Sequence, residues 1–196
     1  WHITDRLDVT GGLRFDAIHT DASAEGYVSL HGTRNESAVT PKIAIGYLLT
    51  DELRLYALYS SGFKPGGFTR TVTPYNFNFM YSNARTDNLE AGIRARLPDG
   101  RLEASAAVYY AYTRGYQAFV GAQPFQHLQN VGDVESYGFD ARIIAQPIAG
   151  LRIEGSLALN NAEYVKYQDQ TGLGVNYNGN RPAYAPQVTA GLDVSY

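Results

Sequence analysis

The connections between the apolar segments of this chain follow a regular pattern of short and long. Tight turns lie at 50–51, 98–100 and 147–150, and each joins two apolar segments directly. Long irregular stretches rich in aromatic residues separate these turns, as at 64–85 and 168–184. If the segments are antiparallel, every short turn lies at one end of the fold and every long loop at the other.

This asymmetry is typical of one class of β-structure. Bacterial outer-membrane barrels have short periplasmic turns and long extracellular loops. Soluble β-sandwiches rarely separate their turns so consistently by length. We therefore expect an all-β fold, an antiparallel up-and-down transmembrane β-barrel segment. The alternative at this point is an antiparallel soluble sheet with one wet face.

The composition agrees with a fold made of strands and turns. The chain has 20 Gly and 16 Tyr, and 13% of its residues are aromatic, which favours strands and turns over helices. No run approaches the roughly 18 apolar residues that indicate a transmembrane helix. The mean hydropathy of −0.28 is typical of a soluble protein. In a membrane barrel, however, apolar lipid-facing residues alternate with polar lumen-facing residues, so the mean stays low. At 196 residues, one domain is the simplest expectation.

Charge and cysteine content exclude several function classes. The formal net charge of −3, with scattered basic residues, argues against nucleic-acid binding. The absence of Cys excludes disulfides and thiolate metal sites. The first residues, WHITDRLDV, are not a signal peptide. We therefore expect that a signal was removed or that the chain is an interior piece of a longer one.

Eight segments have the period-2 alternation of a β-strand. They are Leu7–Thr20, Glu36–Leu49, Leu53–Phe63, Asp87–Leu97, Arg101–Val120, Val131–Gln146, Leu151–Tyr167 and Pro186–Tyr196. Both faces of Leu53–Phe63 are mixed, whereas in each of the others a run of uncharged residues recurs on one face, such as Leu89, Ala91, Ile93, Ala95 and Leu97 of Asp87–Leu97. A Lys or Arg on the lipid face near the membrane midplane costs about 2–4 kcal/mol. Residues such as Ile143 and Leu192 are therefore expected to face lipid, and Arg142 and Asp193 the lumen.

Tyrosines fall at two levels of these segments. Tyr47 and Tyr196 lie at the short-turn end, and Tyr110, Tyr112 and Tyr137 lie about one membrane thickness higher. Two such bands predict interfacial aromatic girdles. The alternative for each residue is the ordinary β-propensity of Tyr.

Four sequence blocks carry a resemblance to a known family. They are VTPKIAIGYLL at 39–49 leading into LRLYALYSSGFKPGGF at 53–68, TDNLEAGIR at 86–94, QNVGDVESYGFD at 129–140 and RPAYAP at 181–186. Over about residues 5–196 the chain resembles the barrel of TonB-dependent outer-membrane receptors, the energised importers of iron–siderophore complexes and related scarce nutrients. One departure is Ala84-Arg85, which replaces the family's frequent Pro-Glu pair and blurs any subfamily.

The resemblance implies more than these residues contain. Family members have a barrel of about 22 strands around an N-terminal plug, with a short energy-coupling TonB box before the plug. Residues 1–196 are therefore expected to be a partial barrel domain, about eight strands in a curved open sheet, without plug or box. The implied location is the bacterial outer membrane. The implied partners are outer-membrane lipid, the protein's own plug, the TonB complex and an iron–siderophore or similar nutrient.

The loop 64–85 is the candidate ligand-binding segment. Its aromatic residues supply rigid contact area, and its Arg and Lys residues supply charge for an anionic ligand, as many ferric siderophores are. The residues are Lys64, Phe68, Arg70, Tyr75, Phe77, Phe79, Tyr81 and Arg85. The alternative is an aromatic loop that packs on itself or on neighbouring loops.

The sequence carries no recognisable catalytic or metal-binding motif. The histidines at 2, 19, 31 and 127 lack metal-ligand spacing and are expected in solvated loops. There is no nucleophile elbow, no Walker A motif and no H-E-x-x-H, so we predict no catalytic residues and no cofactor, and the resemblance implies a transporter and not an enzyme. The Asp133 and Glu135 pair is either an acid/base pair, a Ca²⁺ ligand set or a hydrated rim.

Two alternatives belong to other classes. The first is a complete eight-stranded outer-membrane barrel that acts as an adhesin, a structural protein or a rim hydrolase, and a ladder between the first and last strands would favour it. The second is a soluble β-sandwich binding module.

Gly138 is expected on the inward face of its strand. A missing side chain there allows close approach of another backbone, such as that of a plug. Simple strand curvature is the other explanation for this glycine.

Overall fold

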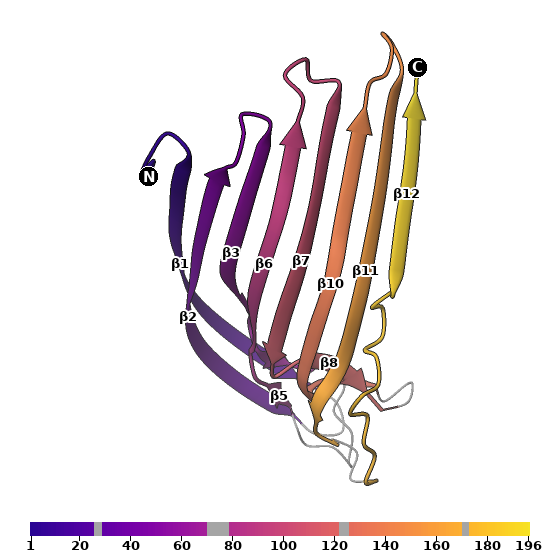
Figure 1. Cartoon of the computed structure of the whole chain (residues 1–196). Coiled ribbons are helices and arrows are strands. Elements are labelled where there is room, and N and C mark those ends of the chain that lie inside the picture. The colour runs from indigo at the N-terminus through magenta and orange to yellow at the C-terminus, as the bar shows by residue number, and fades with distance from the viewer. Residues whose placement is uncertain (26–28, 70–78, 122–125, 170–172) are drawn as a thin grey trace.

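The computed structural model describes residues 1–25, 29–69, 79–121, 126–169 and 173–196. Its main element is one eight-stranded antiparallel sheet, in which the strands follow one another in chain order (Figure 1). The strands are β1 (Leu7–Ala24), β2 (Leu30–Leu48), β3 (Leu53–Lys64), β6 (Ala84–Arg96), β7 (Leu102–Arg114), β10 (Gly132–Ala145), β11 (Arg152–Tyr167) and β12 (Val188–Ser195).

Two small hairpins accompany the main sheet. One pairs β4 (Gly67–Phe68) with β5 (Met80–Tyr81), and the other pairs β8 (Gln117–Val120) with β9 (His127–Asn130). Both lie at the long-loop end of the main sheet (Figure 1). In the described ranges, no helix has the length and apolarity needed to cross a membrane.

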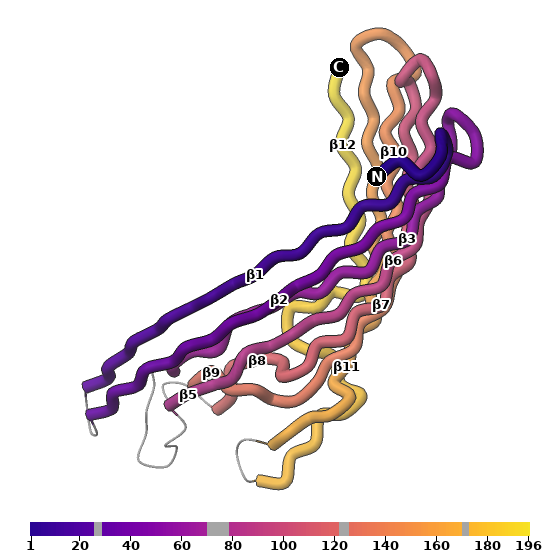
Figure 2. Tube along the Cα trace, turned by 90° about the vertical axis from the view of Figure 1, so that its left-hand side faces the viewer, coloured from indigo at the N-terminus to yellow at the C-terminus, as the bar shows by residue number. Residues whose placement is uncertain are grey.

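The predicted topology is confirmed. The turns after β2, β6 and β10 lie together at one end of the sheet, and the longer connections lie together at the other (Figure 1). Each long strand pairs with its neighbours in the chain, so the sheet is a meander. Within the described residues β1 and β12 form no ladder with each other, so the sheet is curved and open, as predicted (Figure 2).

Two strand boundaries differ from those predicted. The stretch 101–120 is not one strand, because β7 ends at Arg114 and Gly115 turns the chain with a φ of 64°. β8 then pairs in a separate hairpin. The first two strands also run further than expected, to Ala24 and from Leu30, and they project beyond the rest of the sheet (Figure 2).

Polar side-chain pairs sustain the extended part of the β1–β2 hairpin on its exposed face. His19 lies opposite Asn35, and their side chains are 2.6 Å apart. The Thr33 hydroxyl donates to Asp21 at 2.7 Å. Cross-strand polar pairs of this kind stabilise antiparallel sheets without an apolar face. Strand pairing therefore continues past the point where apolar alternation stops.

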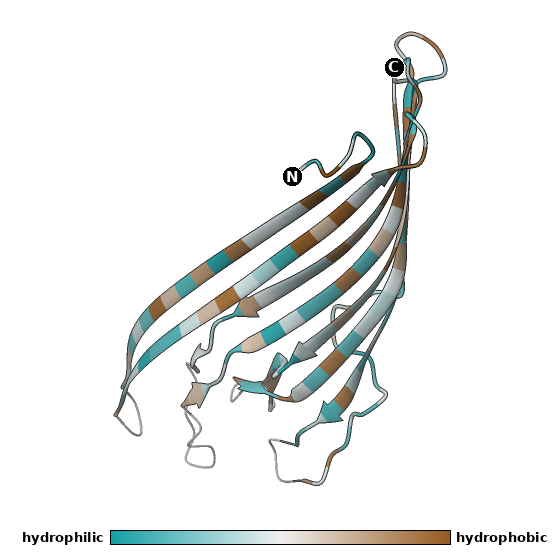
Figure 3. Ribbon diagram, turned by 60° about the vertical axis from the view of Figure 1, so that its left-hand side comes forward, coloured by the Kyte–Doolittle hydropathy of each residue, from teal (hydrophilic) through white to brown (hydrophobic). Residues whose placement is uncertain are grey.

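The apolar faces of the strands lie on the convex side, as predicted. Ile143 is 48% exposed and Leu192 is 77% exposed, values that suit a lipid-facing position. Colouring by hydropathy shows apolar and polar residues alternating along the strands (Figure 3). The opposite side is the concave face of the curved sheet (Figure 2). One pocket on this face is lined by residues of every long strand from β3 to β12. Within the described residues, the buried apolar side chains all lie at the long-loop end: Ala84, Val120, Val131, Val134 and Ala162.

Glycines on the concave face make room for side chains of the wall itself. A Cβ on Gly138 would lie 2.2 Å from the carbonyl oxygen of Leu159 and 2.5 Å from the Tyr109 hydroxyl. Tyr109 uses this space to cross β10 and donate to Asn160 Oδ1 at 3.1 Å. The close neighbour of Gly138 in this structure is therefore a side chain of the same sheet and the backbone of β11.

Candidate functional site

Two regions of the concave face gather charged and aromatic side chains. The first, which we call the loop-end network, joins the long connections to the ends of β2, β7 and β10. The second, which we call the arginine pocket, lies at the short-turn end on β3, β6, β7 and β10. The membrane-spanning part of the wall separates the two regions.

Glu36 is a hub of the loop-end network. Its side chain is only 6% exposed. It forms an ion pair with Arg34 and accepts hydrogen bonds from the Gly66 backbone N at 2.9 Å and from Asn83 Nδ2 at 3.2 Å. Burial opposes ionisation of this carboxyl, but the donors from Arg34 and Gly66 outweigh it and hold its pKa below the usual value. A single carboxylate thus ties both ends of the β3–β6 connection to β2.

Gln117 and Asn130 fasten the same connection to the β8–β9 hairpin. The Gln117 amide donates to the carbonyl oxygens of Pro65 and Ser82, both at 2.9 Å. Asn130 accepts from the Ser82 backbone N at 2.6 Å and donates to the Gly115 carbonyl at 2.6 Å. Side-chain amides therefore replace the strand ladder where the regular sheet ends.

The block Asn130-Val131-Gly132-Asp133 has a structural explanation. Gly132 has a φ of 115°, and the β10–β11 register shifts after Asp133. A Cβ on Gly132 would lie 1.7 Å from the Lys166 carbonyl oxygen, so only glycine fits. Asp133 then accepts from the Gly115 backbone N at 3.0 Å and from the Tyr112 hydroxyl at 2.9 Å. The motif builds a β-bulge and caps the turn that ends β7.

The structure brings some of the predicted ligand-binding residues together. The Phe68 and Phe79 rings lie 5.0 Å apart, and the Tyr81 hydroxyl would lie 2.6 Å from a Cβ on Gly67. Lys64 ends β3 with an exposed side chain, and it forms no ion pair with another described residue. Arg85, on β6, donates instead to Ser61 Oγ at 3.0 Å.

The remaining predicted ligand residues are not placed. Arg70, Tyr75 and Phe77 lie outside the described residues. The described part of the loop therefore contributes a packed aromatic group and two exposed cations, Lys64 and Arg85.

A row of tyrosines on the inner wall was not predicted. Tyr116, Tyr164, Tyr167 and Tyr177 make successive edge-to-face contacts with ring centroids 5.9, 5.5 and 4.8 Å apart. Tyr177 ends the row and is 43% exposed. The residues come from three separate parts of the chain, with Tyr164 and Tyr167 both on β11, so no local pattern marks the whole row. Together they offer an aromatic surface for a planar ligand at the long-loop end.

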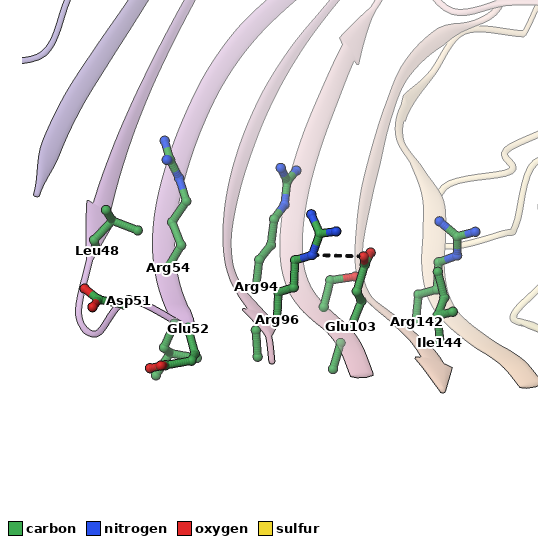
Figure 4. Close-up of a pocket in the computed structure, with 13 residues that line it drawn as sticks. Leu48, Asp51, Glu52, Arg54, Arg94, Arg96, Glu103, Arg142 and Ile144 are labelled. Atoms are coloured by element: carbon green, nitrogen blue, oxygen red, sulfur yellow. Dashed lines mark ion pairs between the residues drawn. The ribbon is translucent and has the colours of Figure 1, made fainter. Parts of the chain in front are cut away.

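The arginine pocket occupies about 520 Å³ and is open to the concave side (Figure 4). Arg96 pairs with Glu103 at 3.3 Å, and Arg142 pairs with Glu154 of β11 at 2.5 Å. Arg54 reaches across β2 to Asp8 of β1 at 2.5 Å, over the space that a side chain at Gly46 would fill. The predicted lumen-facing charges Glu103 and Arg142 therefore lie on the concave face, as expected.

Arg94 differs from the other arginines of this pocket. Its guanidinium lies 4.8 Å from the centre of the Tyr56 ring, a cation–π contact. In the described part of the chain it has no carboxylate partner. It therefore presents a positive charge to the lumen that the wall does not neutralise.

The acidic residues and the histidine at the long-loop end take part in packing and hydrogen bonding. No group of three or more His, Cys, Asp or Glu in the described ranges is arranged to hold a metal ion. His127 was expected in a solvated loop, but it is buried in β9. Asp133 is engaged by Gly115 and Tyr112, and the Tyr110 hydroxyl donates to Glu135 at 3.2 Å. Each carboxylate therefore accepts from a different tyrosine of β7.

A comparison with known families identifies the fold. The family described as "TonB dependent receptor-like, beta-barrel" matches residues 1–196. The chain belongs to the TonB-dependent receptor β-barrel family. Membership places this barrel segment in the bacterial outer membrane, with the convex apolar face toward lipid.

Relatives of this TonB-dependent receptor barrel include named receptors. The chain is 28% identical over 204 residues to the pesticin receptor of Yersinia pestis, covering 100% of this chain and 28% of that protein. It is 26% identical over 197 residues to the ferrioxamine B receptor of Salmonella typhimurium, covering 98% of this chain and 25% of that protein. The chain thus spans about a quarter of the length of these relatives.

Solved structures show the same fold. The ferric yersiniabactin uptake receptor FyuA from Yersinia pestis superimposes with a TM-score of 0.77 at 24% identity, covering 99% of this chain and 29% of that one. The siderophore receptor PiuA from Acinetobacter baumannii gives 0.76 at 21% identity, covering 97% and 29%. The eight-stranded sheet of this TonB-dependent receptor barrel therefore corresponds to part of a larger receptor barrel in both structures.

Replacing Glu36 by Gln is expected to loosen the β3–β6 connection of the TonB-dependent receptor barrel. The change leaves the Arg34 guanidinium without its carboxylate, and a hydrogen bond to a charged group contributes about 1.5–3 kcal/mol. Limited proteolysis of the intact protein in its membrane should show faster cleavage between residues 65 and 83. Glu25→Gln, at an exposed position of the β1–β2 hairpin, is the control and should leave cleavage unchanged.

The same carboxylate sets the pH at which the wild-type connection loosens. Because the pKa of folded Glu36 lies below its usual 4.5, its contribution is fully present above that pH and is lost as the pH falls through the lower folded value. Protease protection that declines on raising the pH from 5 to 8 would contradict this assignment.

Proposed function

We propose that this chain forms part of the wall and outer loops of an energised outer-membrane importer for ferric siderophores. The family match over the whole chain carries the proposal, together with relatives that are named as receptors for pesticin and ferrioxamine B. On this proposal, residues 1–196 are part of a larger barrel domain. Further strands close the barrel, and a plug from the same protein fills it.

The long-loop end is the proposed ligand side. The tyrosine row ending at Tyr177 and the exposed Lys64 offer the aromatic and cationic contacts that suit an anionic chelate with planar groups. Glu36, Gln117 and Asn130 anchor the two ends of the β3–β6 connection, and pre-ordering of a binding surface reduces the entropy lost when a ligand binds. The residues predicted from the sequence, Lys64 to Arg85, remain the proposed contacts within this region.

The concave wall is the proposed contact surface for the plug. The arginine pocket faces the lumen at the short-turn end, and its Arg94 is available to a carboxylate of the plug. Force from the TonB complex would act on the plug from the periplasmic side, and the ligand would pass along the wall. We propose transport and not catalysis, because the residues in these regions serve binding and packing.

The experiment measures ferric siderophore binding to the complete receptor. Tyr177→Ala should weaken binding about twofold to twelvefold, because one aromatic contact contributes about 0.5–1.5 kcal/mol. Tyr184→Ala removes a fully exposed tyrosine outside the row, with an exposure of 103%, and should leave affinity unchanged. Binding is measured by fluorescence quenching, and uptake by radioactive iron. A complete receptor that binds no ferric siderophore but imports another nutrient would contradict the proposed ligand class.

A further inference from the structure

A groove runs along the convex, lipid-facing side of the sheet. Strand register places Ile45, Ala57, Ala91 and Val108 side by side across β2, β3, β6 and β7. The two alanines face each other between two larger residues, so they form the floor of a trough. The hollow occupies about 540 Å³, which is within the range of about 300–1,000 Å³ typical of ligand sites.

The groove continues toward the long-loop end. The next outward-facing row contains Tyr59, Leu89 and Tyr110, and these residues also line a second hollow of about 430 Å³. The second hollow is bordered further along the strands by Arg114 and Lys166. One continuous groove therefore begins in an apolar trough and ends at two cations.

Each of these cations is more exposed than the carboxylate with which it pairs. Arg114 is 2.6 Å from Asp87, and their side chains are 59% and 25% exposed. Lys166 is 3.5 Å from Asp133, and their side chains are 70% and 18% exposed. Each carboxylate thus lies beneath its cation and orients it. An approaching headgroup meets the two positive charges first.

Both cations converge on one aromatic ring. The Arg114 guanidinium and the Lys166 ammonium lie 5.5 and 5.8 Å from the centre of the Tyr112 ring. Lys166 reaches the convex face because the β-bulge after Asp133 skips one residue of β11 and reverses its alternation. The bulge that places Asp133 against the end of β7 therefore also completes the cationic end of the groove.

The position of the groove fits a lipid. Tyr110 and Tyr112 belong to the upper aromatic girdle, which marks the level of the lipid headgroups in the outer leaflet. The trough below them spans about 13 Å between Ala91 and Asp87 at about 3.3 Å per residue. Glu135 and Glu163 lie opposite each other on β10 and β11 and would repel an anion there. An anionic headgroup is therefore directed away from this pair of carboxylates and toward Arg114 and Lys166.

We propose that this groove binds one lipid molecule of the outer leaflet, with a phosphate-bearing headgroup at Arg114 and Lys166 and an acyl chain in the Ala57–Ala91 trough. Basic pockets beside apolar membrane-facing surfaces recognise anionic headgroups by this combination. The groove is part of the outer surface, and the proposal is independent of which nutrient the receptor imports.

The test uses the complete receptor in phosphatidylcholine nanodiscs that contain either phosphatidic acid or diacylglycerol. These two lipids carry the same chains and differ in the phosphate. Native mass spectrometry of the released receptor should show phosphatidic acid bound about tenfold more tightly. The double variant Arg114→Gln, Lys166→Gln should lose this preference. Arg101→Gln, which removes an exposed cation at the short-turn end, should keep it.

A second variant tests the trough. Ala91→Leu fills the floor and should weaken binding of both lipids, whereas Ala141→Leu, a lipid-facing alanine outside the groove, should not. Every variant must retain the heat-resistant electrophoretic mobility of the folded barrel. Equal binding of the two lipids, or an unchanged preference in the double variant, would overturn the proposal. So would equal stabilisation of the detergent-solubilised receptor by inorganic phosphate alone, which would indicate a free-anion site.

Discussion

Ala106→Arg is expected to lower the free energy of unfolding of the intact receptor by about 2–4 kcal/mol. Ala106 lies midway along β7 and points to the convex face, between Ile93 of β6 and Ala141 of β10. An arginine there places its charge near the middle of the bilayer. The measurement is reversible denaturant unfolding of the receptor in lipid vesicles.

The adjacent residue provides a matched control. Ala107 points to the concave face, opposite Gly92 and Asp140. Ala107→Arg introduces the same side chain into the same strand, but beside a carboxylate and a polar hollow. Its cost should be much smaller in a barrel from which the plug has been deleted. Equal destabilisation by the two variants would show that the two faces of β7 are wrongly assigned.

Gly132→Ala should lower the free energy of unfolding more than most other Gly→Ala substitutions in the chain. The added Cβ would lie 1.7 Å from the Lys166 carbonyl oxygen, and the backbone has a φ of 115°. Backbone strain of about 1–3 kcal/mol and overpacking of about 1–3 kcal/mol together predict a loss of about 2–6 kcal/mol. Because the clash is with backbone, β10 and β11 must separate to relieve it. Denaturant unfolding of the full-length receptor measures the loss.

Gly100→Ala separates the two contributions. Gly100 also has a positive φ, 69°, but nothing lies within 4 Å of the position that its Cβ would take. This variant should therefore cost only the backbone strain, about 1–2 kcal/mol. If the two substitutions prove equally costly, the contact with Lys166 is not what restricts residue 132 to glycine.

The main sheet was predictable because residues close together in the sequence determine its strands and their pairing. In a membrane-spanning strand a one-residue slip exchanges the two faces and moves charges into lipid. The alternation around Ile143 and Arg142 therefore specifies both the strand and its orientation. The short turns at 50–51 and 98–100 specify the pairing, since they leave no room for another neighbour. These features predicted the meander and its apolar outer face, and the open form followed from the resemblance to a much larger barrel.

Other features depend on contacts that no local pattern marks. The end of β7 at Arg114 is set by Gly115 and by Asp133, which come from different strands. The extension of β1 and β2 rests on pairs such as His19 with Asn35 in a region without apolar alternation. The block around Asn130 is recognisable in the sequence as a family motif. Its hydrogen bonds to Ser82 and Gly115 could be identified only from the three-dimensional structure.

The candidate site was predictable in outline only. The loop 64–85 was chosen for its aromatic and basic residues, and Phe68 and Phe79 do meet in space. The tyrosine row that includes Tyr164 and Tyr177 assembles from distant segments. Glu36 lies on a predicted strand, outside the loop that the sequence singles out for ligand binding. Ligand surfaces formed between loops are set by tertiary packing, so a search within single loops finds only part of them.

The free edges of β1 and β12 make the folding of this sheet conditional on its surroundings. Each edge carries backbone N–H and C=O groups without partners among the described strands. In hydrocarbon every such group costs several kcal/mol. Insertion of these strands must therefore be thermodynamically coupled to the arrival of pairing strands at both edges. The cooperative unit is the closed ring, and a denaturation midpoint describes that ring and not the eight strands within it.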